Sequence, residues 1–435
     1  MTGYYLKSRY PDLKTLAFIE FLKMRSDARY DRERRDERWL AGAQGGDRQP
    51  LASSKDQWIG PSEMDTKPIS AEAEALAAPP SFLRDPYLEW ATGEGVPVFE
   101  DFGLDLLALE TSHWARFGAA GAIAHLKGRG DFISIFLLDI PPGGKSAPQQ
   151  HLYEEVVFVL AGHGSTSVEL PDGGVHSFEW GPKSLFSLPL NARYRHFNGS
   201  GTAPVRLAST NDLCLVMKIF RDEGFIFDHP FAFAGRDWNA SYFSGEGQFI
   251  AAPRSRSMWE SNFIADVGAV ELIDNPKRGA GSATLAFILA DGMMHAHCSS
   301  MPVGTYKKAH RHGSDYHVTI LTGEGFSLLW YEGDPDFRRI DWRYGWVFAP
   351  PDQMYHQHFN TSGKPARYMA TALGNSRYPF TDKNRQGKLG VDVSVKDGGF
   401  QIEFEDQDPR IHAMFLAALA KDGVECRMSF PGRKP

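Results

Sequence analysis

Residues 351–360 read Pro-Asp-Gln-Met-Tyr-His-Gln-His-Phe-Asn, and residues 189–198 read Pro-Leu-Asn-Ala-Arg-Tyr-Arg-His-Phe-Asn. The leading proline and the closing His-Phe-Asn recur at identical spacing. Upstream, two glycines and a histidine recur as well: Gly143, His151 and Gly162 in the first copy, and Gly304, His312 and Gly323 in the second. The offset between the copies stays at 161 or 162 residues, which chance does not easily produce. The chain therefore contains a duplicated domain.

The sequence around both copies predicts short β-strands. Runs of β-branched and aromatic residues, such as 132–138 and 155–160, alternate with turns rich in glycine, proline and aspartate. Many short strands at regular spacing are typical of a sandwich or barrel. We therefore predict an all-β protein with two tandem barrels.

Helices are expected only at the two ends of the chain. Apolar residues recur at helical spacing in the first fifty residues and again over 408–423, where Gly423 would end the helix. The predicted parts follow in chain order: an N-terminal helix and connector arm over 1–90, the first barrel over 91–235, a linker that folds onto the barrels over 236–279, the second barrel over 280–405, and a C-terminal helix and tail over 406–435.

Composition excludes several classes of partner. A formal net charge of −7 over 435 residues gives no basic surface for nucleic acid. No apolar run approaches the length of about 18 residues that a membrane helix needs. The three cysteines are few and odd in number, which favours a reducing compartment. The N-terminus also lacks the plan of a signal peptide, so we expect a cytoplasmic protein.

Three histidines of the second copy have the spacing of a metal site. His310 and His312 are two residues apart, so on a strand their side chains share one face. His356 follows about 40 residues later, on a strand that can lie alongside the first. Neutral imidazoles that converge in this way bind Fe, Zn, Cu or Ni. The alternative is a polar barrel interior in which the histidines only form hydrogen bonds.

These motifs resemble the two signature motifs of the cupin superfamily: glycine, His-x-His, glutamate and glycine, then proline, histidine and asparagine. The duplication resembles a bicupin over roughly residues 95–235 and 280–405, which implies two double-stranded β-helix (jelly-roll) barrels. In the second copy Tyr316 replaces the expected glutamate, so the ligand set that the resemblance implies is His310, His312 and His356.

The first copy departs further from the pattern. Gln149, His151, Glu155 and Tyr194 occupy its ligand positions, so two of the three expected histidines are absent. His196 could substitute by its strand parity, but a site of one histidine, a glutamate and a glutamine would bind a transition metal poorly. We expect this barrel to be metal-free and structural, offering a dimer surface or a lid.

The three-histidine set resembles that of the gentisate, salicylate and 1-hydroxy-2-naphthoate dioxygenases. Those bicupins also lack the glutamate and carry a Trp-His-Asp-His-Gly-Asn segment similar to residues 355–360. The resemblance implies Fe(II), with Mn, Zn, Ni or Cu as alternatives, and oxidation of a small aromatic or hydroxylated acid by O₂. Because their metal typically lies in the first cupin, only the type of chemistry is implied. A metal-dependent lyase, isomerase or decarboxylase remains an alternative, as does a non-catalytic ligand-binding bicupin.

Further residues near these motifs are candidates for binding or catalysis. His358 could hold substrate or act as a general base, or be a structural histidine. Tyr316 could donate a hydrogen bond to substrate, or only fill the barrel. Arg367 could bind a carboxylate with its two-pronged guanidinium. Other candidates are Lys307, Lys308 and Arg311 as cations, His295 and His297 as cavity lining, and Trp330 and Phe348 as apolar wall. Bicupins commonly pair, so we expect a homodimer or a higher homo-oligomer.

Overall fold

The structure, a computed structural model, describes residues 83–128, 132–236, 238–252, 256–313, 316–378 and 392–428. The helix predicted within the first fifty residues and most of the connector arm lie outside the described residues. The part that is described consists mainly of β-strands, as the alternation of apolar runs and turns predicts.

The first barrel is a sandwich of two antiparallel layers. Its strands are β4 (Ala119–Leu126), β5 (Ser134–Ile140), β6 (Glu155–Ala161), β7 (Gly164–Glu169), β8 (Val175–Trp180), β9 (Leu185–Phe186), β10 (Tyr194–Asn198) and β11 (Val205–Asn211). One layer has the order β4-β5-β11-β6-β9, and the other has the order β10-β7-β8. Bridges from Lys145 to Phe197 and from Gln149 to Tyr194 add residues 145–149 on the free side of β10. This strand order is that of a jelly roll.

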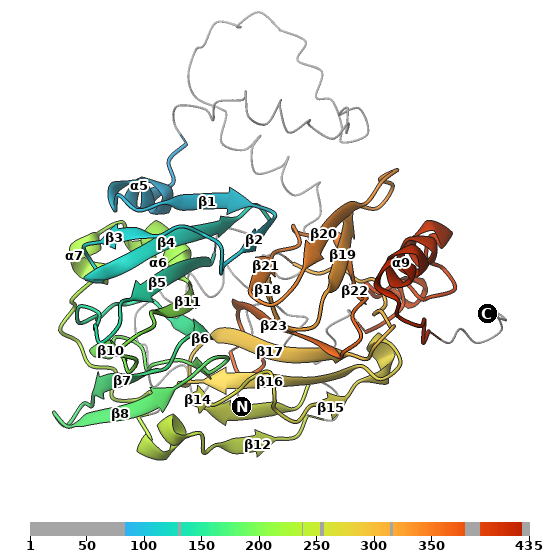
Figure 1. Cartoon of the computed structure of the whole chain (residues 1–435). Coiled ribbons are helices and arrows are strands. Elements are labelled where there is room, and N and C mark those ends of the chain that lie inside the picture. Colours follow the sequence, from blue (N-terminus) through green and yellow to red (C-terminus); the bar gives the residue numbers. More distant parts are fainter. Residues whose placement is uncertain are drawn as a thin grey trace, which may run out of the picture. The chain divides into compact units, whose positions relative to one another are not determined.

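The second barrel repeats this order strand for strand (Figure 1). Its strands are β16 (Ala283–Leu289), β17 (Met294–Met301), β18 (His317–Thr322), β19 (Gly325–Trp330), β20 (Arg338–Trp342), β21 (Trp346–Phe348), β22 (Tyr355–Asn360) and β23 (Ala366–Leu373). The layers are β16-β17-β23-β18-β21 and β22-β19-β20. Bridges from Tyr306 to Phe359 and from His310 to His356 add residues 306–310 beside β22. The predicted fold of two tandem jelly-roll barrels is thus confirmed.

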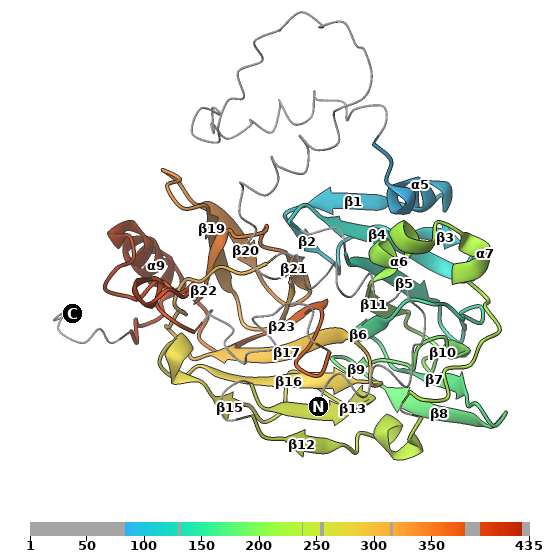
Figure 2. The same ribbon diagram turned by 180° about the vertical axis from the view of Figure 1, so that it is seen from behind.

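The remaining elements connect or extend the barrels. They are α5 (Pro86–Gly93), β1 (Val98–Asp101), β2 (Gly103–Asp105), β3 (Ser112–Trp114), α6 (Leu213–Phe220), α7 (Glu223–Ile226), η1 (Ala240–Ser244), β12 (Gln248–Ile250), β13 (Met258–Ser261), β14 (Phe263–Ile264), β15 (Ile273–Asp274), η2 (Pro276–Arg278), η3 (Val395–Asp397) and α9 (Pro409–Asp422). The C-terminal helix α9 lies beside β22 (Figures 1 and 2). Its apolar side packs on the aromatic residues of β19 and β22.

The two barrels exchange edge strands. β2 precedes the first barrel in sequence but pairs with β21 of the second, Gly103 opposite Phe348. Conversely, β14 lies after the first barrel but pairs with β9, Phe263 opposite Phe186. An apolar layer between the two large sheets joins them, and it includes Leu137, Phe158, Phe287, Cys298 and Met369. This layer explains why β6 and β16 are near-continuous apolar runs, since both faces of each sheet are buried.

A repeated glycine tests the strand packing. A Cβ atom on Gly325 would lie 1.9 Å from the carbonyl oxygen of Phe359, and the equivalent Gly164 has the same restriction beside Phe197. We expect Gly325→Ala to destabilise the protein by about 2 kcal/mol, because the overlap forces β19 and β22 apart. The measurement is the midpoint of urea unfolding. Gly363→Ala is the control, because its Cβ would meet nothing within 4 Å. Equal midpoints for the two variants would contradict this packing.

Candidate metal centre

The structure brings together the three histidines that the spacing predicts. One ring nitrogen from each of His310, His312 and His356 lies within 4.8 Å of the others, and no other such group occurs among the described residues. His310 and His356 pair directly across two strands: the His310 amide donates to the His356 carbonyl at 3.1 Å, and the reverse bond is 2.9 Å. Their Nε2 atoms are 3.1 Å apart. Neighbouring ligands of a metal with bonds of about 2.1 Å are separated by about 3 Å.

Two of the three rings, those of His312 and His356, are held for coordination through Nε2. His312 Nδ1 lies 2.6 Å from the Gly313 carbonyl, and His356 Nδ1 lies 3.2 Å from the Met354 carbonyl. A backbone acceptor at Nδ1 leaves the lone pair on Nε2, as is common for metal-binding histidines. Burial lowers the pKa of His312 to about 4 and those of His310 and His356 well below their usual value. All three are therefore neutral near pH 7, which is the form that binds metal.

A buried arginine that the sequence did not point to touches this group. Arg278 Nη2 lies 2.5 Å from Nδ1 of His310 and 3.2 Å from its Nε2. Arg278 Nη1 donates to the side chain of Gln401 at 2.9 Å, and Asp392 lies 3.6 Å from Nε. A metal on His310 Nε2 requires a proton on Nδ1, which Arg278 cannot accept. Metal binding at His310 therefore requires Arg278 to turn away from Nδ1.

Tyr316 and His358 both lie beside the three histidines. The Tyr316 ring centre is 4.3 Å from that of His312. His358 Nδ1 lies 2.8 Å from the hydroxyl of Ser327, which also accepts a bond from Trp342. The first barrel repeats this His358 arrangement. There, His196 Nδ1 lies 2.8 Å from the hydroxyl of Thr166, which accepts a bond from Trp180 at 2.9 Å. Because it recurs without the metal ligands, this hydrogen bond belongs to the barrel scaffold, and a catalytic role of His358 stays a prediction.

Arg367 lies outside the barrel interior that holds the histidines, and its role in binding substrate stays a prediction that this position does not support. It donates to the carbonyl of Val270 at 2.8 Å. Side chains alternate along β23, and it is Tyr368 that faces the interior, 5.0 Å from the His358 ring. Its equivalent in the first barrel, Arg206, likewise donates to backbone carbonyls away from the interior.

Of the other predicted cations, only Lys307 faces the interior. It is buried, and its amine contacts the hydroxyl of Ser299 and lies 3.3 Å from that of Tyr368. Lys308 pairs with Glu403, and Arg311 pairs with Glu332, both on the outer side.

The predicted lining residues divide in the same way. His295 and His297 are buried, 2.8 Å apart at Nε2 and Nδ1, and their rings lie 5.9 and 6.4 Å from that of Tyr316. Phe348 packs 5.7 Å from His358. Trp330 instead packs on Tyr355 within the cluster beneath α9, so it does not form a wall of the site.

The first barrel uses its polar residues internally. The Gln149 amide donates to the backbone carbonyls of Arg116 and Pro148, each at 3.0 Å. His151 Nε2 lies 3.1 Å from the Tyr194 hydroxyl, which donates to Glu155. Burial alone would raise the pKa of Glu155, but hydrogen bonds from its neighbours lower it to about 2. The remaining cavity of about 20 Å³ has little more space than one water. The side chains at the ligand positions of the first barrel thus bond to one another and to the backbone, and its structural role stays a prediction.

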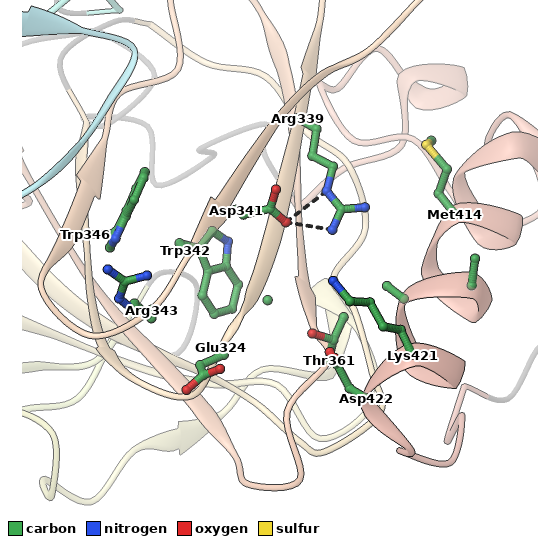
Figure 3. A pocket seen from close by; sticks show the side chains of 13 residues that line it. Glu324, Arg339, Asp341, Trp342, Arg343, Trp346, Thr361, Met414, Lys421 and Asp422 are labelled. Atoms are coloured by element: carbon green, nitrogen blue, oxygen red, sulfur yellow. Dashed lines mark hydrogen bonds and ion pairs between the residues drawn. The ribbon is translucent and has the colours of Figure 1, made fainter.

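A separate pocket of about 590 Å³ lies between β20 and α9 (Figure 3). Its arginines are paired, since Arg339 bonds Asp341 at 2.6 Å and Arg343 bonds Asp105 at 2.7 Å. None of the histidines lines it. We therefore place the candidate chemistry inside the second barrel.

Comparisons with known proteins bear on the fold alone. No family model and no curated protein matches the sequence. Similar solved structures include a deletion mutant of oxalate decarboxylase from Bacillus subtilis, with 10% identity and a TM-score of 0.42 over 63% of this chain and 78% of that one. Another is the formate complex of oxalate decarboxylase from Lactobacillus farciminis, with 10% identity and a TM-score of 0.42 over 63% and 86%. Because these identities and TM-scores are low, we assign the fold from the strand order of this chain.

Two further observations concern the sequence-based expectations. In the part of the chain that the structure describes, no helix is both long and apolar enough to cross a membrane. Cys214, Cys298 and Cys426 form no disulfide.

Proposed function

We propose that this protein is a metal-dependent enzyme, and that it uses Fe(II) and O₂ to oxidise a small organic acid inside the second barrel. The observation that carries the proposal is the convergence of His310, His312 and His356 as three neutral imidazoles without a carboxylate. When bound, the metal supplies a Lewis acid and a template on which substrate and O₂ meet.

The residues around the histidines support binding and orientation of an acid. Burial raises the pKa of Tyr316, so its hydroxyl stays protonated near pH 7 and can donate to substrate or O₂. Lys307 places a buried amine in the same barrel interior and supplies a cation for a carboxylate. Phe348 and the apolar residues around it limit access of water to this interior.

One contact favours a second candidate, a metal-dependent lyase, isomerase or decarboxylase. Lys307 and Tyr368 form a buried amine–phenol pair. Burial lowers the pKa of Lys307. Burial alone would raise the pKa of Tyr368, but the charges of Lys307 and Arg278 lower it. Such a pair can hold a proton and return it to a carbanion or enolate, a step that needs no O₂.

Oxygen dependence separates the two candidates. The protein is purified anaerobically without added metal, its metal content is measured, and hydroxylated aromatic acids are screened in an oxygen electrode. We expect O₂ uptake that stops after chelation and returns with Fe(II). Absence of iron at appreciable occupancy, or full turnover without O₂, would contradict the dioxygenase. Turnover without O₂ that still needs a metal would favour the lyase.

A further inference from the structure

The duplication allows the interiors of the two barrels to be compared position by position. In the first barrel Leu138 of β5 lies opposite Leu207 of β11. The equivalent residues of the second barrel are Ser299 of β17 and Tyr368 of β23, which also lie opposite each other. A backbone bond matches Ser146 with Lys307: the Ser146 amide donates to the carbonyl of His196 at 2.9 Å, and the Lys307 amide donates to that of His358 at 3.1 Å.

Two arginines are placed by the same method. The Phe117 carbonyl accepts a bond from residue 147, and the Arg278 carbonyl accepts one from residue 308, 161 positions later. Val98 of β1 and Met258 of β13 occupy equivalent places. The residue of β4 opposite Val98 pairs with Phe136, and the residue of β16 opposite Met258 pairs with His297. Two residues before them lie Val96 and Arg256.

The comparison shows a consistent change of chemistry between the barrels. The first barrel fills these positions with buried apolar residues and one serine: Val96, Phe117, Phe136, Leu138, Leu207 and Ser146. The second barrel fills them with polar or cationic residues: Arg256, Arg278, His297, Ser299, Tyr368 and Lys307. Since the first barrel folds around the apolar set, the fold does not need the cations.

Among the residues that the structure describes, these cations exceed the anions around them. Arg278 has Asp392 at 3.6 Å. Within the described ranges, Lys307 and Arg256 form no ion pair with a carboxylate. Arg256 Nη1 lies 3.0 Å from His297 Nδ1, and its buried Nε has no hydrogen-bond partner in the described part of the chain. Lys307 is buried and Arg256 is half-buried. Charges removed from water without counter-ions destabilise a fold, so two such cations at one site indicate an anionic ligand.

We propose that the interior of the second barrel binds a substrate with two anionic groups, for which Lys307, Arg256 and Arg278 are the counter-ions. The inference rests on the proposed function in that this substrate would also reach the metal centre. Two cations remain after Asp392 is paired, and this count favours a dicarboxylate, or a carboxylate with an ionised hydroxyl, over a monoanion. Arg278 also becomes available to such a ligand when it turns away from His310.

The test compares dianions with matched monoanions. Binding of malonate and phthalate is measured by titration calorimetry at pH 7.5, alongside acetate and benzoate. Both the protein as purified and the chelator-treated protein are used. We expect each dianion to bind about 10-fold or more tighter than its monoanion in both forms. Equal affinities, or no binding of either dianion, would overturn the proposal.

Neighbouring cations provide matched controls. In Lys307→Met and Arg256→Leu the preference for dianions should fall to about 2-fold or less, whereas in Lys308→Met and Arg311→Leu it should stay unchanged, because those side chains face outward. Circular dichroism checks the fold of each variant. An equal loss in the control variants would also overturn the proposal.

The two forms of the protein separate this proposal from the proposed function. Preference for dianions in a protein that never binds metal would keep the anion site and reject the metalloenzyme. A metal-loaded, active protein without the preference for dianions would keep the metalloenzyme and reject the anion site.

Discussion

Replacing His356 with alanine is expected to remove the metal from the protein. In the proposed centre His356 would supply one of three ligands, with its Nε2 atom 3.1 Å from that of His310, and the two remaining imidazoles would hold an ion only weakly. Loss of an outer hydrogen-bond partner already weakens metal sites by about 10- to 100-fold, and loss of a ligand should exceed the upper end of that range. The measurement is metal per chain after dialysis against a weak chelator, together with the affinity from a competition titration.

The duplicated barrel supplies the control for this experiment. His151 occupies in the first barrel the position that His312 occupies in the second, and it is held by Tyr153 and Tyr194. We expect His312→Ala to lose metal like His356→Ala, and His151→Ala to keep it. Full metal content in His356→Ala, or loss of metal in His151→Ala, would contradict the assignment of the centre to the second barrel.

The sequence predicted the ligands because their geometry follows from local rules. His310 and His312 share a face through the period of a strand, and repeated motifs placed His356 beside them. The two barrels were predictable for the same reason, since a duplicated pattern of strands and glycines leaves few alternatives.

The residues that complete the site were less predictable because they come from outside the motifs. Arg278 ends a 3₁₀ turn 32 positions before His310, and Arg256 precedes a short strand in the predicted linker. No periodicity connects either to the histidines. Lys307 and His310 both face inward although they are three residues apart, so this segment departs from regular alternation.

The position of Arg367 outside the barrel interior follows from strand parity. The prediction for Arg367 considered only its position just after the second motif. The parity of its strand turns the neighbouring Tyr368 inward instead. The sequence did contain a signal for the interior, namely the change from Leu207 to Tyr368 and from Phe117 to Arg278 between the copies. Matching these positions between the copies requires the strand register, which only the paired strands of the structure provide.

The stability of the metal-free protein is expected to fall as the pH is lowered from 7.5 to 5.5. Burial lowers the pKa of His196 to about 4 and that of His295 to about 3, and it lowers the pKa of His297 well below its usual value. The three histidines of the candidate metal centre, His310, His312 and His356, and the neighbouring His358 shift in the same direction. The unfolded chain takes up protons near pH 6.5 that the folded protein does not, so stability falls with pH.

One buried group opposes this trend. Burial, with the nearby charge of Glu154, raises the pKa of Asp212 to about 8. The folded protein therefore binds a proton that the unfolded chain releases, and Asp212 adds stability as the pH falls. Over this range each histidine costs about 1.3 kcal/mol and Asp212 returns about 2.5 kcal/mol. Seven histidines outweigh one carboxyl, and the net loss is on the order of 6 kcal/mol.

Urea unfolding at pH 7.5 and 5.5, in the presence of a chelator, measures this difference. Asp212→Asn removes the opposing group, so its stability should fall more steeply with decreasing pH than that of the unmodified protein. Stability that is constant or rises toward pH 5.5 would show that the buried histidines are charged, and neutral imidazoles could then no longer be assumed at the metal centre.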